Sequence, residues 1–122
     1  MKQILLVDDD RDLAKLFAFG LRLRGYEVQV AANGREALAL LDVRSFDVIV
    51  LDWNMPVMGG DEFLEQYQHR TASIPSIPII VITARADVEH RARQLGAVAV
   101  LAKPFNLNEV VRVLARLLGD SQ

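Results

Sequence analysis

Five short apolar runs, which begin about every twenty to thirty residues, constrain the fold of this 122-residue chain more than any other feature. They are rich in β-branched residues and are predicted to be strands, at 3–7, 27–31, 47–51, 78–83 and 97–101. The segments between them carry apolar residues with helical spacing, and the interval matches the length of a right-handed strand–helix crossover unit. The sequence therefore predicts an α/β fold of the (βα)5 type, with a doubly wound parallel sheet. The run at 27–31 alternates apolar and polar residues, as an edge strand does.

Capping and turn residues mark where four of the predicted helices begin. They are Asn33 with Gly34, Gly60, Ala86 with Asp87, and Asn106. The first helix shows apolar residues spaced i, i+3, i+4, i+7 and i+8, which are predicted to face the core, and it ends near Gly25. These apolar residues are Leu13, Leu16, Phe17, Gly20 and Leu21. Phe19 lies off this stripe, so the edge of the core and a docking surface are both open for it.

Polar residues collect at the carboxyl ends of the predicted strands. A doubly wound sheet of five strands commonly has the flavodoxin-like order 2-1-3-4-5, and its ligands bind beyond the carboxyl ends, where the order reverses. The polar residues at or just after these ends are Asp8, Asp9, Asp52, Thr83 and Lys103. The second strand ends in alanine and contributes none. We therefore expect these side chains to converge on one shallow pocket.

Three carboxylates in one pocket need a positive partner, because two unit charges about 4 Å apart repel by about 1 kcal/mol in water and several times more in a partly buried cleft. A hard divalent cation with oxygen ligands meets this need, and Mg2+ suits an open pocket best. Lys103 adds a fixed positive charge, so the set suits a phosphoryl group held on or beside a carboxylate. The chain has no cysteine, no glycine-rich phosphate loop and no plausible Ser/His pair. The candidate nucleophile is therefore an aspartate, and Asp52 stands alone at the end of the central strand.

Composition is that of a single water-soluble domain. Hydrophobic residues make up 52% of the chain and charged residues 25%, which is enough for the core of one domain spanning 1–122. A net charge of −2 argues against a general nucleic-acid or acidic-membrane surface. The N-terminal apolar run is too short for a signal peptide or a membrane span, and cysteine is absent, so a cytoplasmic location is expected.

Four motifs in fixed order carry a resemblance to a known family: "VDD" at 7–9, "LDWNMPVMGG" at 51–60, "ITA" at 82–84 and "KPF" at 103–105. Along its whole length the chain resembles a bacterial two-component response-regulator receiver domain of the single-domain, chemotaxis type. The resemblance implies a phosphorylation-activated signalling switch rather than an enzyme, although the family catalyses its own slow dephosphorylation. It implies a sensor histidine kinase or a histidine phosphotransfer protein as partner, with no direct nucleic-acid binding and no membrane contact by this domain.

The resemblance also implies roles for individual residues. Asp52 is expected to accept the phosphoryl group from a phosphohistidine. The implied Mg2+ ligands are Asp9, Asp52, the backbone carbonyl of Asn54 and, through a water molecule, Asp8. Lys103 is expected to neutralise the phosphoryl oxygens, and Thr83 to move and hydrogen-bond one of them. The family also implies a cis bond between Lys103 and Pro104, and X-Pro bonds are the ones that adopt cis at low cost.

The same resemblance implies a docking region and two positions that affect dephosphorylation. The start of the first helix, at Leu13 and Ala14, and the loop at Phe105 correspond to the region where the histidine-bearing partner docks. Asn54 and Arg85, each two places past a pocket residue, resemble positions that tune dephosphorylation.

The chain departs from the family pattern at two places. Receivers usually carry Tyr or Phe three places before the lysine, where this chain has Val100. We therefore hypothesise that it signals through a different or weaker rearrangement of that face. The stretch "GAVAVLAKPF" lacks the acidic pair of receivers that dimerise through the fourth helix, fifth strand and fifth helix, so that dimer is less expected.

Two other functions stay open. A phosphorylation-independent interaction module would keep the fold and lose the switch; Val100 supports it, and the complete pocket counts against it. A small hydrolase acting through an aspartyl phosphate would need a second aspartate as general acid, where the chain has Asn54. Residues assigned to packing or to the surface rather than to chemistry are Trp53, Met55, His69 and His90.

Overall fold

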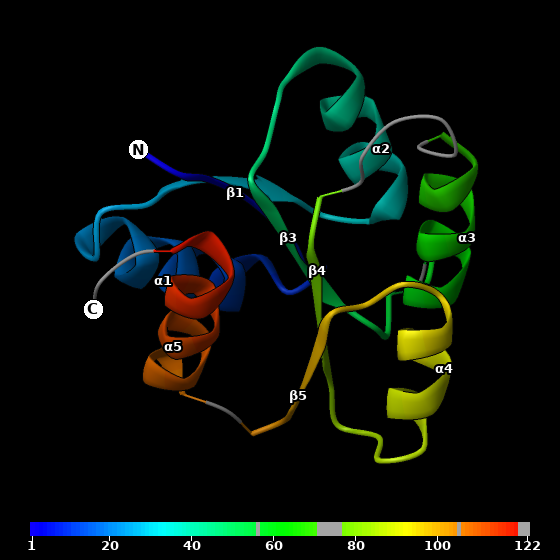
Figure 1. Cartoon of the computed structure of the whole chain (residues 1–122). Helices are drawn as coiled ribbons and strands as arrows, with labels where there is room; N and C mark the ends of the chain where they lie inside the picture. The colour runs from blue at the N-terminus through cyan, green and yellow to red at the C-terminus, as the bar shows by residue number, and fades with distance from the viewer. Residues whose placement is uncertain (56, 71–76, 105, 120–122) are drawn as a thin grey trace.

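The computed structural model describes residues 1–55, 57–70, 77–104 and 106–119. Strands and helices alternate along these ranges (Figure 1). The strands are β1 (Gln3–Val7), β2 (Glu27–Ala31), β3 (Val48–Asp52), β4 (Ile79–Thr83) and β5 (Ala99–Ala102). The helices are α1 (Arg11–Leu23), α2 (Gly34–Val43), α3 (Gly60–Arg70), α4 (Val88–Gln94) and α5 (Leu107–Leu118).

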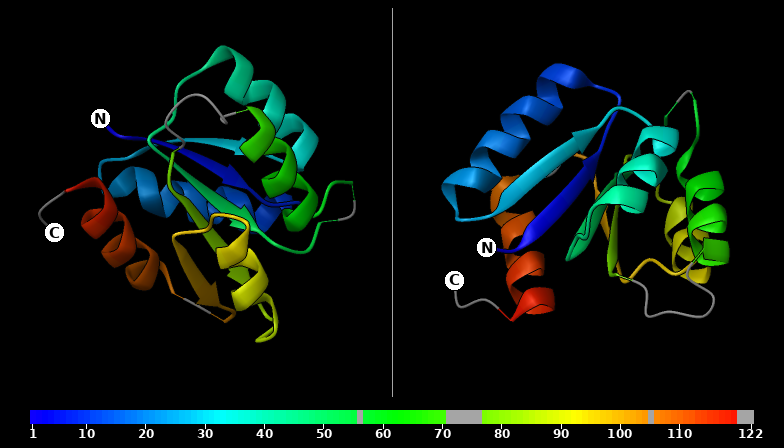
Figure 2. Two further views of the ribbon diagram at one scale, coloured as in Figure 1. Left: turned by 45° about the vertical axis from the view of Figure 1, so that its right-hand side comes forward. Right: turned by 90° about the horizontal axis from the view of Figure 1, so that it is seen from above.

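The strands form one parallel sheet in the order β2-β1-β3-β4-β5, as predicted. Seen from above, α1 and α5 lie on one side of the sheet and α2, α3 and α4 on the other (Figure 2). The (βα)5 flavodoxin-like architecture is therefore confirmed. None of the described helices is both long and apolar enough to cross a membrane.

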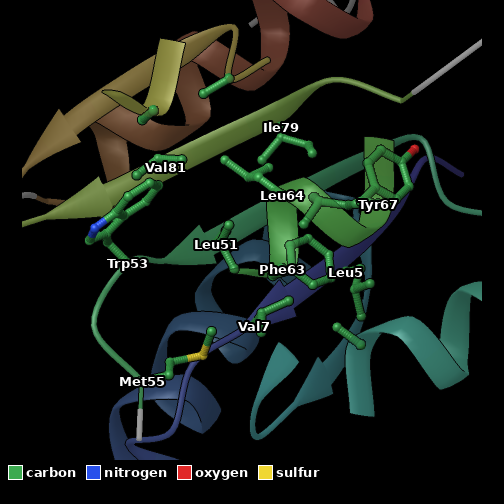
Figure 3. Packing of buried hydrophobic residues seen from close by; sticks show 14 of the residues in the cluster. Leu5, Val7, Leu51, Trp53, Met55, Phe63, Leu64, Tyr67, Ile79 and Val81 are labelled. Atoms are coloured by element: carbon green, nitrogen blue, oxygen red, sulfur yellow. The ribbon is translucent and has the colours of Figure 1, made fainter. Parts of the chain in front are cut away.

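Each face of the sheet carries its own apolar core, because successive side chains of a strand point to opposite faces. Leu5 and Val7 of β1 pack with α2, α3 and α4, whereas Ile4 and Leu6 pack with α1 and α5. Figure 3 shows the first of these clusters, in which Phe63 and neighbouring residues of α3 cover the sheet. The central strands β3 and β4 are buried along their whole length, and β2 is partly exposed, as expected for an edge.

Side-chain caps fix the start of three helices. Asp10, Asn33 and Asn106 each accept a hydrogen bond from the backbone N–H three residues later. Asp10 caps α1, which confirms that the acidic run after β1 divides between a helix start and the pocket. The cap of α5 is a reciprocal capping box between Asn106 and Glu109.

The predicted core-facing stripe of α1 is wrong in part. The buried residues of this helix are Ala14, Ala18 and Leu21, whereas Leu13 is 45% exposed and Leu16 is 69% exposed. Small alanines allow α1 to lie close to the sheet, and the larger leucines turn outward. Leu16 therefore belongs to the surface and not to the core.

The boundaries of three strands also differ from the prediction. β3 is Val48–Asp52 rather than 47–51, β4 begins at Ile79 rather than at 78, and β5 is Ala99–Ala102 rather than 97–101. Ala97 is excluded from the strand because its N–H donates to the carbonyl of Ala92 at the end of α4.

Candidate functional site

Three carboxylates converge at the carboxyl ends of β1 and β3. These strands are neighbours, with Val7 opposite Leu51, so Asp8 and Asp9 after β1 lie beside Asp52 at the end of β3. Oxygen atoms of all three aspartates lie within 4.8 Å of one another. Asp52 is 6% exposed, Asp8 is partly buried and Asp9 faces solvent. These three carboxylates were predicted to converge, and they lie together in the structure.

Lys103 supplies the cation of the cluster. It follows the edge strand β5, and its Nζ donates a 3.0 Å hydrogen bond to Oδ1 of Asp52. Its backbone N–H donates to the carbonyl of Thr83, which fixes the turn after β5. The Lys103–Pro104 bond is cis, as the resemblance implied.

The electrostatics of Asp8 show how crowded the cluster is. Burial is the largest influence that raises the pKa of this carboxyl, and the charges of Asp52 and Asp9 raise it further. The Asp10 N–H, which donates to Asp8 Oδ1 at 2.9 Å, and the charge of Lys103 act in the opposite direction. The net effect is a raised pKa, because burial and the two neighbouring carboxylates outweigh the Asp10 N–H and the single lysine.

Thr83 ends β4, the strand next to β3. The residue is 3% exposed, and its Oγ1 accepts a 3.1 Å hydrogen bond from the N–H of Arg85. Asp52 lies opposite Ile82 in the ladder, so Thr83 is one residue further along the same edge of the sheet. Thr83 therefore ends the strand next to Asp52, at the same edge of the sheet.

The segment after Asp52 folds back over the sheet. Trp53 and Met55 are both 8% exposed and belong to the apolar core (Figure 3), which confirms that they pack rather than form a substrate-binding lip. A β-carbon added to Gly60 would lie 2.6 Å from Cε3 of Trp53, so the indole rests directly on the first residue of α3. Asn54, between the two buried side chains, is exposed.

An apolar wall beside the polar cluster was not anticipated from the sequence. The pocket next to Asp52 and Lys103 is lined on one side by Leu6, Leu13, Phe17 and Ile82. These residues come from the sheet and from α1, and they explain why Asp52 is nearly excluded from water. Their common location follows from three-dimensional packing and has no motif in the sequence.

The outer surface of α1 leads away from this pocket. Large apolar side chains follow one another along it and are exposed; they are Leu13, Leu16, Phe19 and Leu23. Ala14, which was predicted to share in docking, is fully buried, so it has no surface to offer a partner. Phe105, the other predicted docking position, lies outside the described residues. His69 and His90 are exposed, as predicted.

The site has the features of an aspartate-based phosphoacceptor. A nearly buried carboxylate is paired with a lysine, and two further carboxylates lie close enough to share a hard cation with it. Thr83 ends the neighbouring strand. The site lies at the carboxyl ends of the strands where the strand order reverses, which is where ligands of this fold class bind.

Comparison with known proteins gives the family. Residues 4–115 match the response regulator receiver domain, and the chain belongs to that family. It is therefore a phosphorylation-activated switch of two-component signalling rather than an enzyme in the ordinary sense.

Three similar proteins illustrate the range of the family. The transcriptional regulatory protein CpxR of Klebsiella pneumoniae is 41% identical over 125 residues, which cover 99% of this chain and 51% of the relative. The chemotaxis protein CheY4 of Vibrio cholerae has a TM-score of 0.87 and 36% identity, covering 96% of this chain and 98% of that one. TrrA of Thermotoga maritima, solved in complex with Mg(2+)-BeF, has a TM-score of 0.84 and 30% identity, covering 96% of this chain and 99% of that one. The chain spans about half the length of the curated relatives it matches.

Proposed function

We propose that Asp52 accepts a phosphoryl group from a phosphohistidine of a sensor kinase or a phosphotransfer protein. The observation that carries this proposal is the 3.0 Å contact between Lys103 Nζ and Asp52 Oδ1 inside a cluster of three carboxylates. In the transfer, an Asp52 oxygen forms a bond to phosphorus while the bond from phosphorus to the donor imidazole nitrogen breaks. The imidazole leaves with the bonding electron pair.

The donor set fits Mg2+. The carboxylate oxygens lie within 4.8 Å of one another, and oxygen ligands are those this ion prefers. We expect Asp9, Asp52 and the backbone carbonyl of Asn54 to bind it directly and Asp8 to bind it through water. When bound, the ion neutralises charge on the carboxylates and on the phosphoryl oxygens. Its presence in TrrA concerns that protein and supports the same use here.

Lys103 and Thr83 act on the phosphoryl oxygens in this proposal. The ammonium group of Lys103, already within hydrogen-bond distance of Asp52, is positioned to pair with an oxygen of the phosphorylated side chain. The Thr83 hydroxyl accepts from the Arg85 N–H, which leaves its own proton to donate toward the same group. Slow self-dephosphorylation then requires only water, and we expect Asn54 and Arg85 to influence its approach.

Phosphorylation by a small-molecule donor tests the acceptor directly. With Mg2+ and phosphoramidate or acetyl phosphate, the chain should gain one phosphoryl mass, and Asp52→Asn should abolish the gain. Mg2+ should also change the fluorescence of Trp53, the single tryptophan, which adjoins Asp52. Intact protein that gains no mass under these conditions would disprove the proposal.

The exposed apolar surface of α1 is the proposed docking site for the histidine-bearing partner. Leu13 lines the pocket itself, and Leu16 and Phe19 continue from it along the helix. A contact there would bring the donor imidazole to the open side of the carboxylate cluster. Burying such side chains against a partner is favourable, because it removes apolar surface from water.

A comparison of two phosphoryl donors separates an effect on partner docking from an effect on the phosphoryl transfer itself. Phe19→Gln should slow transfer from the phosphorylated partner about tenfold or more, with phosphoramidate labelling unchanged. Val43→Gln is a matched control, because Val43 is 75% exposed but lies on α2, on the other side of the sheet. If the two substitutions affect transfer equally, the proposal that α1 is the docking surface is refuted.

A phosphorylation-independent module is the second candidate. Val100 favours it, because the residue is partly buried in β5 and is too small to reproduce the movement of an aromatic side chain. Phosphoryl labelling that leaves partner binding unchanged would support it over the switch. A cytoplasmic location stays a prediction.

A further inference from the structure

Arg85 is held by two contacts of different kinds. Its backbone N–H donates to Oγ1 of Thr83 at 3.1 Å, so the residue is anchored at the carboxyl end of β4, the strand that pairs with the Asp52 strand. Its guanidinium group turns to Asp87 and pairs with it through two nitrogens, Nε to Oδ1 at 3.2 Å and Nη2 to Oδ2 at 2.7 Å. A two-point pair of this kind fixes the plane and direction of the guanidinium group.

Asp87 makes this pair in place of an interaction expected from its position. It directly precedes α4, where an aspartate commonly accepts a hydrogen bond from the first turn. Its backbone is instead in the right-handed helical region, with φ −75° and ψ −9°, and its side chain makes no cap bond. The hydrogen bond from Arg85 is the main reason why the pKa of Asp87 is lowered. The Asp87 carboxylate therefore pairs with Arg85 and does not cap α4.

Both groups lie in solvent, with side-chain exposures of 56% for Arg85 and 68% for Asp87. An exposed pair of this kind contributes little to folding stability, so its value as a stabilising contact is small. The ion pair between Arg85 and Asp87 is also easily broken when an anion that binds arginine more strongly is present. A phosphoryl group carries more negative charge and more acceptor oxygens than one carboxylate, and arginine binds such groups through the same two-point geometry.

We propose that Asp87 is a positioning residue that competes with the phosphoryl group on Asp52 for the guanidinium group of Arg85. In the resting protein Asp87 holds Arg85 away from the acceptor; in the phosphorylated protein Arg85 turns to the phosphoryl oxygens and Asp87 is released. This inference rests on Asp52 being the phosphoacceptor. It adds a residue outside the pocket that sets how strongly the phosphorylated form is held.

The test is a double-mutant cycle on the affinity for beryllofluoride, a phosphoryl mimic, in the presence of Mg2+. Binding is followed through the fluorescence of Trp53. Asp87→Asn keeps the shape of the side chain and removes its charge, and it should tighten binding about fivefold because Arg85 is no longer held by a carboxylate. Asp87→Glu keeps the charge and should bind as the wild type does.

Substitution of the arginine decides between competition and a general charge effect. In an Arg85→Gln background, Asp87→Asn should change the affinity by less than about twofold, since no guanidinium group is left to release. Tightening that persists in that background would overturn the proposal, because loss of negative charge near the pocket would then explain it. Unchanged affinity of Asp87→Asn alone would overturn it as well.

The proposed function has its own control in the same experiment. Wild-type protein should bind beryllofluoride and Asp52→Asn should not. If the wild type fails to bind, the acceptor proposal and the competition fall together. If it binds and the cycle shows no coupling between Arg85 and Asp87, the competition alone is refuted.

Discussion

Replacing Asp8 by Asn should stabilise the metal-free protein, which is an unusual result for a residue of a functional site. Asp8 carries one of three carboxylates whose oxygens lie within 4.8 Å of one another. At that distance two unit charges repel by about 1 kcal/mol in water and by about 3.5 kcal/mol at the effective dielectric near a protein surface. Asp8 is partly exposed and also attracted by Lys103, so solvent screening and this attraction reduce the net effect. We expect a gain of about 1 kcal/mol and a Tm higher by about 3–6 °C.

The substitution leaves the local backbone contact in place, because the Asn oxygen can accept the Asp10 N–H as Asp8 does now at 2.9 Å. Thermal unfolding with a chelator and with saturating Mg2+ measures the effect. The variant should be more stable than the wild type with the chelator and should gain less from Mg2+, since the stabilisation by a bound ligand rises with the logarithm of its concentration divided by Kd.

The effect should depend on pH in a defined direction. The folded-state pKa of Asp8 is raised, so the wild type loses stability as pH rises through that pKa and the carboxyl ionises. The advantage of Asp8→Asn should widen over the same range. Asp12→Asn is the control: Asp12 lies in the first turn of α1, where negative charge is favourable, so its loss should cost about 0.3–1 kcal/mol. An Asp8→Asn variant less stable than the wild type in chelator would refute the repulsion argument.

Three other substitutions test the surroundings of the site. Lys103→Met removes the cation 3.0 Å from Asp52 and should lower the free energy of unfolding by about 1.5–3 kcal/mol, measured by urea titration. Gly60→Ala places a methyl group 2.6 Å from the Trp53 ring and should cost about 1–3 kcal/mol, with a shifted emission spectrum; an unchanged spectrum would contradict the contact. Asn106→Ala breaks the capping box of α5 and should cost about 1 kcal/mol, whereas Asn108→Ala, inside the same helix, should cost clearly less.

The sheet and most of the site could be predicted because their signals are local. Each strand is a short apolar run, the interval between runs fixes the crossover, and the crossover fixes which strand ends share an edge. Asp8, Asp52 and Lys103 were placed together by that rule although they are distant in sequence. Predicting that Lys103 and Asp52 converge on one pocket needed no knowledge of side-chain conformation.

The surface of α1 could not be predicted in the same way. This helix is apolar on two faces, so a periodicity count cannot tell which face is buried. Alanines add little to a hydrophobic pattern, yet Ala14 and Ala18 form the buried face because they let the helix approach the sheet. The ion pair between Arg85 and Asp87 could not be predicted from the sequence either. It depends on the turn in which the Val88 N–H donates to the carbonyl of Arg85.

The replacement of an aromatic residue by Val100 changes which part of the molecule can transmit a movement of Thr83. Val100 lies in β5 opposite Val81 and is partly buried, and a β-branched side chain is stiff about its first torsion. A change of the Val100 rotamer can therefore transmit little of a movement of Thr83. Thr83, however, is tied by its carbonyl to the N–H of Lys103 and by its hydroxyl to the N–H of Arg85. A shift of Thr83 toward a phosphoryl group must strain both hydrogen bonds, so its effect is expected at the end of β5 and in the loop that leads into α4.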